Sequence, residues 1–195
     1  MSAYSIAHFI EQHYSEYYKW ESYPADECVR IHKIAEEWGV FSNFAHTDLV
    51  VDGVRFNSAE RLFQCLKFKD AEALKAVYNA PNPKFAAKKY EKACRREDWG
   101  EIIVDAMKYC LMVKYEQSEE FRTKLERSKD KYIVEDQSSF PKKTPDTWGV
   151  KSDGKGNFEG PNLLGRLLME LRDNGRFEYK RSLDSIVEPI VTLKR

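Results

Sequence analysis

Hydrophobic residues recur at helical spacing through most of the chain. The clearest case runs from Asp98 to Tyr115, where apolar positions return every three or four residues and predict the longest helix. A tyrosine-rich segment over residues 1–20 places Ile6, Phe9 and Ile10 near the same spacing. The other predicted helices cover residues 58–69, 71–79, 84–95, 119–128 and 163–172. The pattern therefore indicates a mostly helical protein.

Only a few short segments have the pattern of strands. Val29 to Ile34 alternates apolar and basic residues, and residues 132–135 form a second short candidate. Two β-branched runs flank Asp52-Gly53, a strong signal for an antiparallel hairpin. Residues 21–27 are interpreted as a linker, and the proline- and glycine-rich stretch 138–161 as a loop. The predicted class is α+β, predominantly helical, with a small antiparallel β element.

The length of 195 residues suits one compact domain with additions at its ends. We place an N-terminal accessory helix and linker at residues 1–28, the compact domain at 29–175, and a C-terminal tail at 176–195. The chain has no signal-peptide pattern, and no apolar run approaches the roughly 20 residues that cross a membrane. The sequence thus predicts a cytoplasmic or nuclear protein with no membrane contact.

Charge and cysteine content narrow the function. Lys+Arg and Asp+Glu both number 32, so the net charge of zero excludes a general nucleic-acid coat protein. Any contact with nucleic acid should be local. The four cysteines form no CxxC pair, and no histidine lies beside them at metal-ligand spacing, so we expect reduced thiols and no metal. No obligate protein partner is evident.

One predicted helix has a row of polar side chains. Glu60, Gln64 and Lys67 stand at i, i+4 and i+7, opposite an apolar side formed by Ala59, Leu62, Phe63 and Leu66. This row aligns a carboxylate, an amide and an amine along one side of the helix, which suits acid–base chemistry. The same row also fits a solvated polar face. Asn57 or Ser58 can cap the helix; with Asn57 as the cap, Glu60 completes a capping box.

Two loops could hold a ligand. Four glycines between Gly149 and Gly160 approach a helix that opens near Asn162, which suits either a phosphate site or a flexible surface loop. Trp148 can stack on a base or fill the core beneath. Earlier in the chain, Ser42-Asn43 lies between aromatic residues, as either a nucleoside contact or a tight turn.

Together these segments resemble the NADAR family, also called YbiA-like, in both order and spacing. The resemblance covers about residues 30 to 174. The matching runs are Gly39–Phe44, Asp52-Gly53, Ser58–Phe68, Trp148-Gly149 and Asn162–Arg172. The sequence departs from the bacterial pattern at Arg61, where His is common, and at Cys65-Leu66 and Val29–His32. These changes adjoin the expected pocket and leave the exact substrate open.

The resemblance implies a catalytic domain that cleaves N-glycosidic bonds without a cofactor. Glu60 and Lys67 correspond to the catalytic pair, and Asn43, Phe44, Gln64, Trp148, Gly149 and Asn162 to the ligand site. The expected reaction removes ADP-ribose from ADP-ribosylated guanine, as a nucleotide or in DNA or RNA. Alternatives are cleavage of an early riboflavin-pathway phosphoribosylamino-pyrimidine, and an ADP-ribose or nucleotide-binding module without catalysis.

In both reactions an exocyclic amine is attached to ribose C1, so the sugar can open to an imine. An unprotonated lysine can then displace the base, and water can hydrolyse the Schiff base. We therefore predict Lys67 as nucleophile, Glu60 as general acid and base, and Gln64 orienting one of them. A simpler mechanism uses Glu60 alone to activate water, with Lys67 only binding phosphate or hydroxyl.

Overall fold

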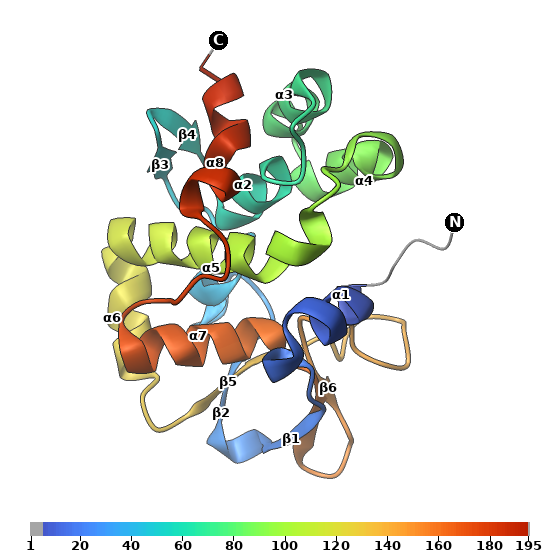
Figure 1. The fold of residues 1–195 in the computed structure, drawn as a ribbon. Coiled ribbons are helices and arrows are strands. Elements are labelled where there is room, and N and C mark those ends of the chain that lie inside the picture. The colour runs from blue at the N-terminus through green and yellow to red at the C-terminus, as the bar shows by residue number, and fades with distance from the viewer. Residues whose placement is uncertain (1–5, 195) are drawn as a thin grey trace. The chain divides into compact units, whose positions relative to one another are not determined.

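The computed structural model describes residues 6–194. Residues 1–5 of the predicted N-terminal segment and Arg195 of the predicted tail lie outside the described residues. The chain divides into two compact units, the first formed by residues up to 42 together with 120–177, and the second by residues 43–119 together with 178 onward. Each unit therefore combines two segments that lie apart in the sequence. Figure 1 labels the helices and strands of both units.

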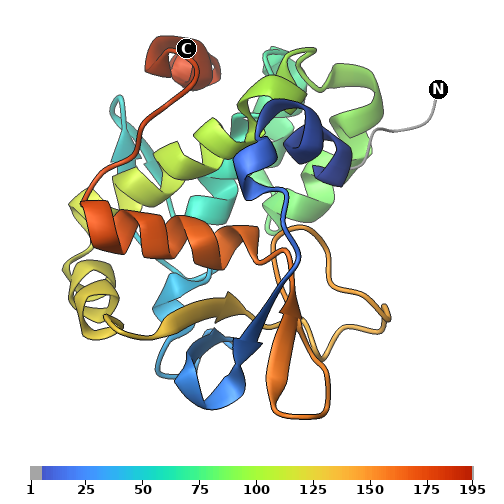
Figure 2. The same cartoon turned by 60° about the horizontal axis from the view of Figure 1, so that its bottom comes forward.

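The first unit combines short strands with three helices. Its three-stranded antiparallel sheet has the order β1-β7-β6, and β2 pairs in parallel with β5. Figure 2 shows β1 beside the hairpin of β6 and β7. The elements are α1 (Ile6–His13), η1 (Ser15–Tyr17), β1 (Glu21–Pro24), η2 (Ala25–Glu27), β2 (Cys28–Ile31), η3 (Gly39–Phe41), α6 (Glu119–Arg127), β5 (Tyr132–Glu135), β6 (Lys151–Ser152), β7 (Asn157–Gly160) and α7 (Leu163–Asn174).

Helix α7 packs closely on β5 because Gly165, in its first turn, has no side chain. A Cβ atom added at Gly165 would come within 2.0 Å of the Ile133 carbonyl oxygen. One turn earlier, Asn162 adopts a left-handed φ of 49°. Its amide donates to the Ile133 oxygen at 2.9 Å and accepts from the Glu135 N–H at 3.1 Å. The start of α7 is thus fixed to the strand by side-chain hydrogen bonds.

The second unit is built around α2. This helix packs against α3, α4 and α5, and a hairpin of β3 and β4 lies against the same group (Figure 1). Buried leucine, isoleucine, valine and aromatic side chains fill the spaces between these helices. The elements are β3 (Leu49–Val51), β4 (Val54–Phe56), α2 (Ala59–Cys65), α3 (Ala71–Asn79), α4 (Pro83–Cys94), α5 (Trp99–Gln117) and α8 (Leu183–Thr192).

The structure confirms the α+β, predominantly helical class and the hairpin at Asp52-Gly53. Two interpretations were wrong: the linker at residues 21–27 contains β1, and the loop at 138–161 contains β6 and β7. The tail, for which the sequence predicted no element, contains α8. The strands β1 and β7 complete each other's hydrogen bonding, and these partners lie far apart in sequence. The boundaries at 28 and 175 stay a prediction. No helix within residues 6–194 is long and apolar enough to cross a membrane.

Candidate active site

The N-terminus of α2 positions Glu60. Ser58, rather than Asn57, caps the helix, because its hydroxyl accepts from the Arg61 N–H at 3.2 Å. Glu60 therefore occupies the second helical position and forms no capping box. Its own N–H donates to the carbonyl oxygen of Asn43 at 2.8 Å. All seven residues of α2 are buried, so Glu60 and Gln64 do not form a solvated polar face; the Lys67 side chain, just beyond the helix, is 12% exposed.

The carboxyl group of Glu60 is held in a largely dry environment. Only 6% of the residue is exposed, and its Oε1 accepts from Gln64 Nε2 at 2.8 Å. Burial raises the pKa of the Glu60 carboxyl, while the Gln64 hydrogen bond and the charges of Lys84 and Lys67 partly oppose that rise. Among the described residues Oε2 has no hydrogen-bond partner. Glu60 can therefore hold a proton and exchange it through its second oxygen.

Lys67 lies just beyond the end of α2. The regular helix ends at Cys65, and a tightened turn follows in which the Lys67 N–H donates to the Gln64 oxygen at 3.4 Å. Lys67 is therefore not the next member of one regular helical row. Its ammonium lies 5.6 Å from the centre of the Trp99 ring and 5.8 Å from that of Phe63. These rings cover the amine with apolar surface.

Three charged groups act on this amine. Lys67 Nζ lies 3.6 Å from Oε1 of Glu91 on α4, and the same oxygen lies 3.6 Å from Nη1 of Arg95. Burial lowers the pKa of the Lys67 amine; Glu91 and Glu60 oppose that change, and Arg95 adds to it. The pKa of the buried acid thus moves up and that of the buried amine moves down, which brings neutral forms of both groups toward neutral pH.

Two buried oxygens near this pair lack hydrogen-bond donors. The side-chain oxygens of Asn43 and Gln64 are buried and have no partner among the described residues. The Asn43 Nδ2 donates to the sulfur of Met107 at 3.2 Å. The neighbouring Phe44 is 45% exposed, with Lys84 Nζ 5.5 Å from its ring centre. Buried unpaired acceptors are costly, so a ligand with hydroxyl or N–H donors would relieve them.

The remaining predicted site residues belong to the first unit. The backbone oxygens of Thr147, Trp148 and Gly149 accept from the N–H groups at the start of α7. The donors expected to face a phosphate are therefore already used there. The amide of Asn162 is fully buried and fixes α7 to β5. Direct ligand contacts by Trp148, Gly149 and Asn162 stay predictions.

Several residues around Lys67 were not anticipated from the sequence. Glu91, Arg95 and Trp99 come from α4, the residues after it and α5, and Lys84 comes from the start of α4. In the sequence these residues lie in ordinary amphipathic helical patterns, so no motif marked them as site residues. Arg61, a departure from the family pattern, donates from Nη1 to carbonyl oxygens at the end of α3. Within residues 6–194 no three His, Cys, Asp or Glu side chains gather as a metal site requires.

Comparison with protein families tests the predicted resemblance. The model of the NADAR domain matches residues 31–176, three quarters of the chain. This chain belongs to the NADAR family. The matched region contains every predicted site residue and the whole of α2 to α7.

Relatives of this NADAR chain point the same way. The N-glycosidase YbiA of Shigella flexneri is 31% identical over 150 residues, covering 76% of this chain and 88% of that protein. The riboflavin biosynthesis protein VVA0006 of Vibrio vulnificus is 26% identical over 191 residues, and the match spans 48% of that longer protein. The NMR structure of Escherichia coli YbiA superposes with a TM-score of 0.60 at 27% identity, covering 80% of this chain and 92% of that one.

Proposed function

We propose that this NADAR protein is an N-glycosidase that removes ADP-ribose from ADP-ribosylated guanine. The observation that carries the proposal is the pair of a buried Glu60 and a Lys67 whose side chain is only 12% exposed, with the pKa of the acid raised and that of the amine lowered by their removal from water. An enzyme needs such shifts to have a proton donor and a neutral amine together near pH 7. The N-glycosidase name of the YbiA relative supports the reaction class.

The reaction begins with opening of the ribose ring. Glu60 gives a proton to the ring oxygen as its bond to C1 breaks, leaving a protonated imine between C1 and the exocyclic nitrogen of guanine, which keeps its own proton. The neutral amine of Lys67 adds to C1, and one of its protons passes to the guanine nitrogen. The bond between C1 and guanine then breaks, and guanine leaves as a neutral amine. Lys67 now holds the sugar as a Schiff base.

Water completes the cycle. Ionised Glu60 takes a proton from water as the oxygen adds to C1, and the new hydroxyl group then passes its proton to the Lys67 nitrogen as the bond between C1 and Lys67 breaks. The free aldehyde of ADP-ribose closes again to its ring form, and Lys67 returns as an amine. No electron donor or acceptor is needed. The unpaired oxygens of Asn43 and Gln64 are suited to accept from ribose hydroxyls while these bonds change.

The main alternative substrate is a phosphoribosylamino-pyrimidine, and the name of the VVA0006 relative favours it. It has the same linkage, so the same residues would act. A further alternative is a module that binds ADP-ribose without cleaving it. Such a module would have no need to bury Glu60 or to leave only 12% of the Lys67 side chain exposed, since removing a charged group from water is unfavourable.

The purified chain should be mixed in parallel with ADP-ribosyl-guanosine and with the phosphoribosylamino-pyrimidine. We expect release of ADP-ribose with a kcat/KM at least about 100-fold above that for the pyrimidine, since one built site discriminates strongly between different leaving groups. Mass spectrometry measures both products. Faster cleavage of the pyrimidine would assign the alternative substrate, and binding of ADP-ribose with no cleavage of either would leave the binding module.

The pH dependence of turnover should respond in opposite directions to two neighbours of Lys67. Glu91 raises the pKa of Lys67 and Arg95 lowers it. The acid limb of the kcat/KM profile reports protonation of the Lys67 amine. In Glu91→Gln this pKa falls, so the limb moves to lower pH; in Arg95→Gln it rises, so the limb moves to higher pH. Steady-state rates between about pH 5 and 10 measure both.

Glu91→Gln keeps the length and shape of the original side chain, and Arg95→Gln removes the guanidinium charge on a shorter side chain. A purely structural role would lower the rate by the same factor at every pH and leave the limbs in place. Lys69→Gln is the matched control, because Lys69 pairs with Glu188 at 2.7 Å rather than with Glu91. If both Glu91→Gln and Arg95→Gln moved the limb in the same direction, Lys67 would not be the group that it reports.

A further inference from the structure

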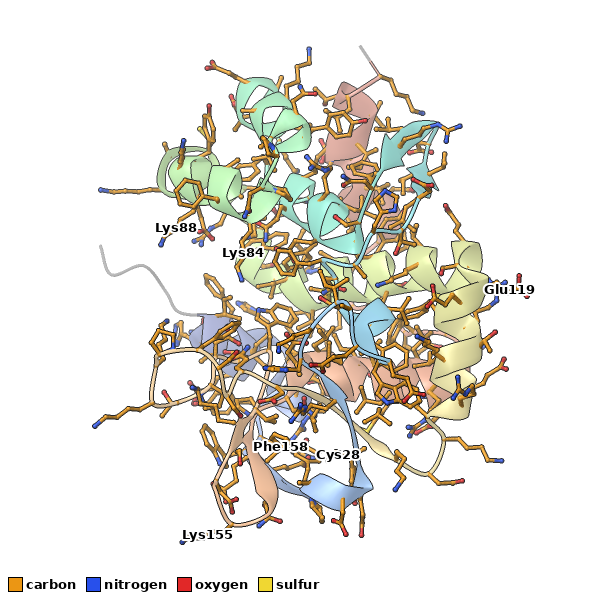
Figure 3. All side chains as sticks on the ribbon, turned by 180° about the vertical axis from the view of Figure 1, so that it is seen from behind. Cys28, Lys84, Lys88, Glu119, Lys155 and Phe158 are labelled. Carbon is orange, nitrogen blue, oxygen red and sulfur yellow. The ribbon has the colours of Figure 1, made fainter. Side chains whose placement is uncertain are left out.

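Helix α4 has a strong local charge on a protein whose net charge is zero. Its twelve residues contain four lysines and one glutamate. Lys84, Lys88 and Lys92 stand at i, i+4 and i+8, which places them along one side of the helix over about 12 Å. All three are exposed. Within the described residues the salt bridges at α4 join Glu91 to Lys67 and Arg95, and none of them involves these three lysines. Figure 3 shows Lys84 and Lys88 extending from α4. We call these three residues the lysine row.

Exposed aromatic rings accompany the lysine row. Phe85 on the same helix is 65% exposed, with Lys89 Nζ 5.5 Å from its ring centre. Phe44 is 45% exposed and has Lys84 Nζ at 5.5 Å from its ring centre. Both rings are thus accessible at the surface beside the lysines. Lysines interleaved with exposed rings are typical of surfaces that follow a single nucleic-acid strand, with phosphates on the cations and bases on the rings.

The lysine row is also joined to the proposed active site within the same compact unit. Lys84 at one end acts on the charge of Glu60. Glu91, between Lys88 and Lys92, lies 3.6 Å from the amine of Lys67. A strand bound along α4 would therefore run past the two groups proposed to act on its modified base. This contact is local, as the balanced charge of the chain requires.

We propose that the lysine row of α4 binds the phosphate backbone of a single-stranded nucleic acid that carries the modified guanine. This inference rests on the proposed function for the identity of the reacting base. It makes the substrate a polymer rather than a free nucleotide or a small biosynthetic intermediate. An unpaired strand is the natural partner, because enzymes that react with a base need it out of the double helix.

The salt dependence of the affinity should report how many phosphate groups the lysine row contacts. Each phosphate contact on a single strand contributes about 0.7 to the slope of log affinity against log salt concentration, so three lysines give a slope of about −2. Affinity for an unmodified 12-nucleotide single-stranded DNA should then fall roughly 20-fold between 50 and 200 mM salt. Fluorescence anisotropy of a labelled oligonucleotide measures this binding without any turnover.

The double variant Lys88→Gln/Lys92→Gln removes two of the three contacts and leaves Lys84 beside Glu60 in place. Its slope should fall to about −0.7, and its affinity at 50 mM salt should be at least about tenfold weaker. KM for an ADP-ribosylated oligonucleotide should rise by a similar factor, while cleavage of ADP-ribosyl-guanosine keeps its rate. The matched control is Lys129→Gln/Lys155→Gln, which removes the same charge from exposed lysines of the first unit.

The outcomes separate docking from catalysis. If both double variants lost the same affinity for the oligonucleotide, the loss would follow from net charge alone and the proposal would be overturned. Unchanged affinity in the α4 variant would overturn it as well. Tighter binding to vesicles of anionic lipid than to the oligonucleotide would assign the lysine row to a membrane surface instead. If the oligonucleotide binds through α4 but ADP-ribosyl-guanosine is not cleaved, docking stands and the proposed function fails.

Discussion

Replacement of Lys67 by methionine should reduce kcat by at least about 1,000-fold, because the route through a Schiff base loses its nucleophile. Methionine fills similar space and suits the apolar surface of Phe63 and Trp99. The variant should therefore stay folded and keep its affinity for ADP-ribose. Borohydride added during turnover reduces a Schiff base to a stable amine, and mass spectrometry should find the sugar on Lys67 in the wild-type chain only.

Lys69→Met provides the matched control. Lys69 is two residues away, its side chain is 46% exposed, and its ammonium pairs with Glu188 at 2.7 Å. This variant should keep both full activity and the trapped adduct. An active wild-type enzyme that yields no adduct at Lys67 would favour the simpler mechanism. In that case Glu60 alone activates water, and the loss in Lys67→Met appears in KM instead of kcat.

Local signals in the sequence were sufficient for α3 and α7, though not for α8. Helix α3 spans Ala71–Asn79 as predicted, because Asp70 caps its start by accepting from the Ala73 N–H at 2.8 Å and a proline follows its end. Gly175, with a φ of 69°, likewise ends α7, because glycine adopts the left-handed conformation of a helix end without strain. These determinants lie within one turn of the helix end, so a single sequence contains them.

Strand pairing was not predictable in the same way. The strand β1 contains Pro24 and only four residues, and it resembled a linker until its partner was known. That partner, β7, lies in a glycine-rich segment near the other end of the chain. The parallel pair of β2 and β5 also joins distant segments. Register between such segments depends on tertiary packing, which leaves no short-range pattern.

The candidate site was predictable only in part. The helical row correctly placed Glu60 and Gln64 together, since they form a hydrogen bond of 2.8 Å. It could not distinguish a buried row from a solvated one, because burial depends on which helices pack around α2. The family resemblance identified Glu60 and Lys67 as candidates. The apolar cover from Trp99 and the carboxylate of Glu91, which set the state of the amine, come from later elements and appeared only in the structure.

Replacement of Glu60 by glutamine should lower kcat/KM by about 100- to 10,000-fold, the range expected when a general acid and base is removed. The amide keeps the shape of the carboxyl group and can still bond to Gln64. Both mechanisms fail if Glu60→Gln retains full activity, since each requires this carboxyl group to move a proton. The matched control is Glu72→Gln on α3, an exposed residue whose substitution should leave kcat/KM unchanged.

The same substitution should raise stability near neutral pH, and this separates lost catalysis from lost folding. Burial raises the pKa of Glu60 in the folded state. While Glu60 is protonated, its carboxyl group adds to the free energy of unfolding. This contribution is complete below the unfolded pKa of about 4.3 and is lost as the pH rises through the folded pKa. Glutamine has no charge to bury, so the free energy of unfolding of Glu60→Gln should exceed that of the wild type at pH 7 and match it near pH 4. Urea unfolding at the two pH values measures the difference. An inactive variant that is also less stable than the wild type at pH 7 would mean that Glu60 supports the fold rather than the reaction.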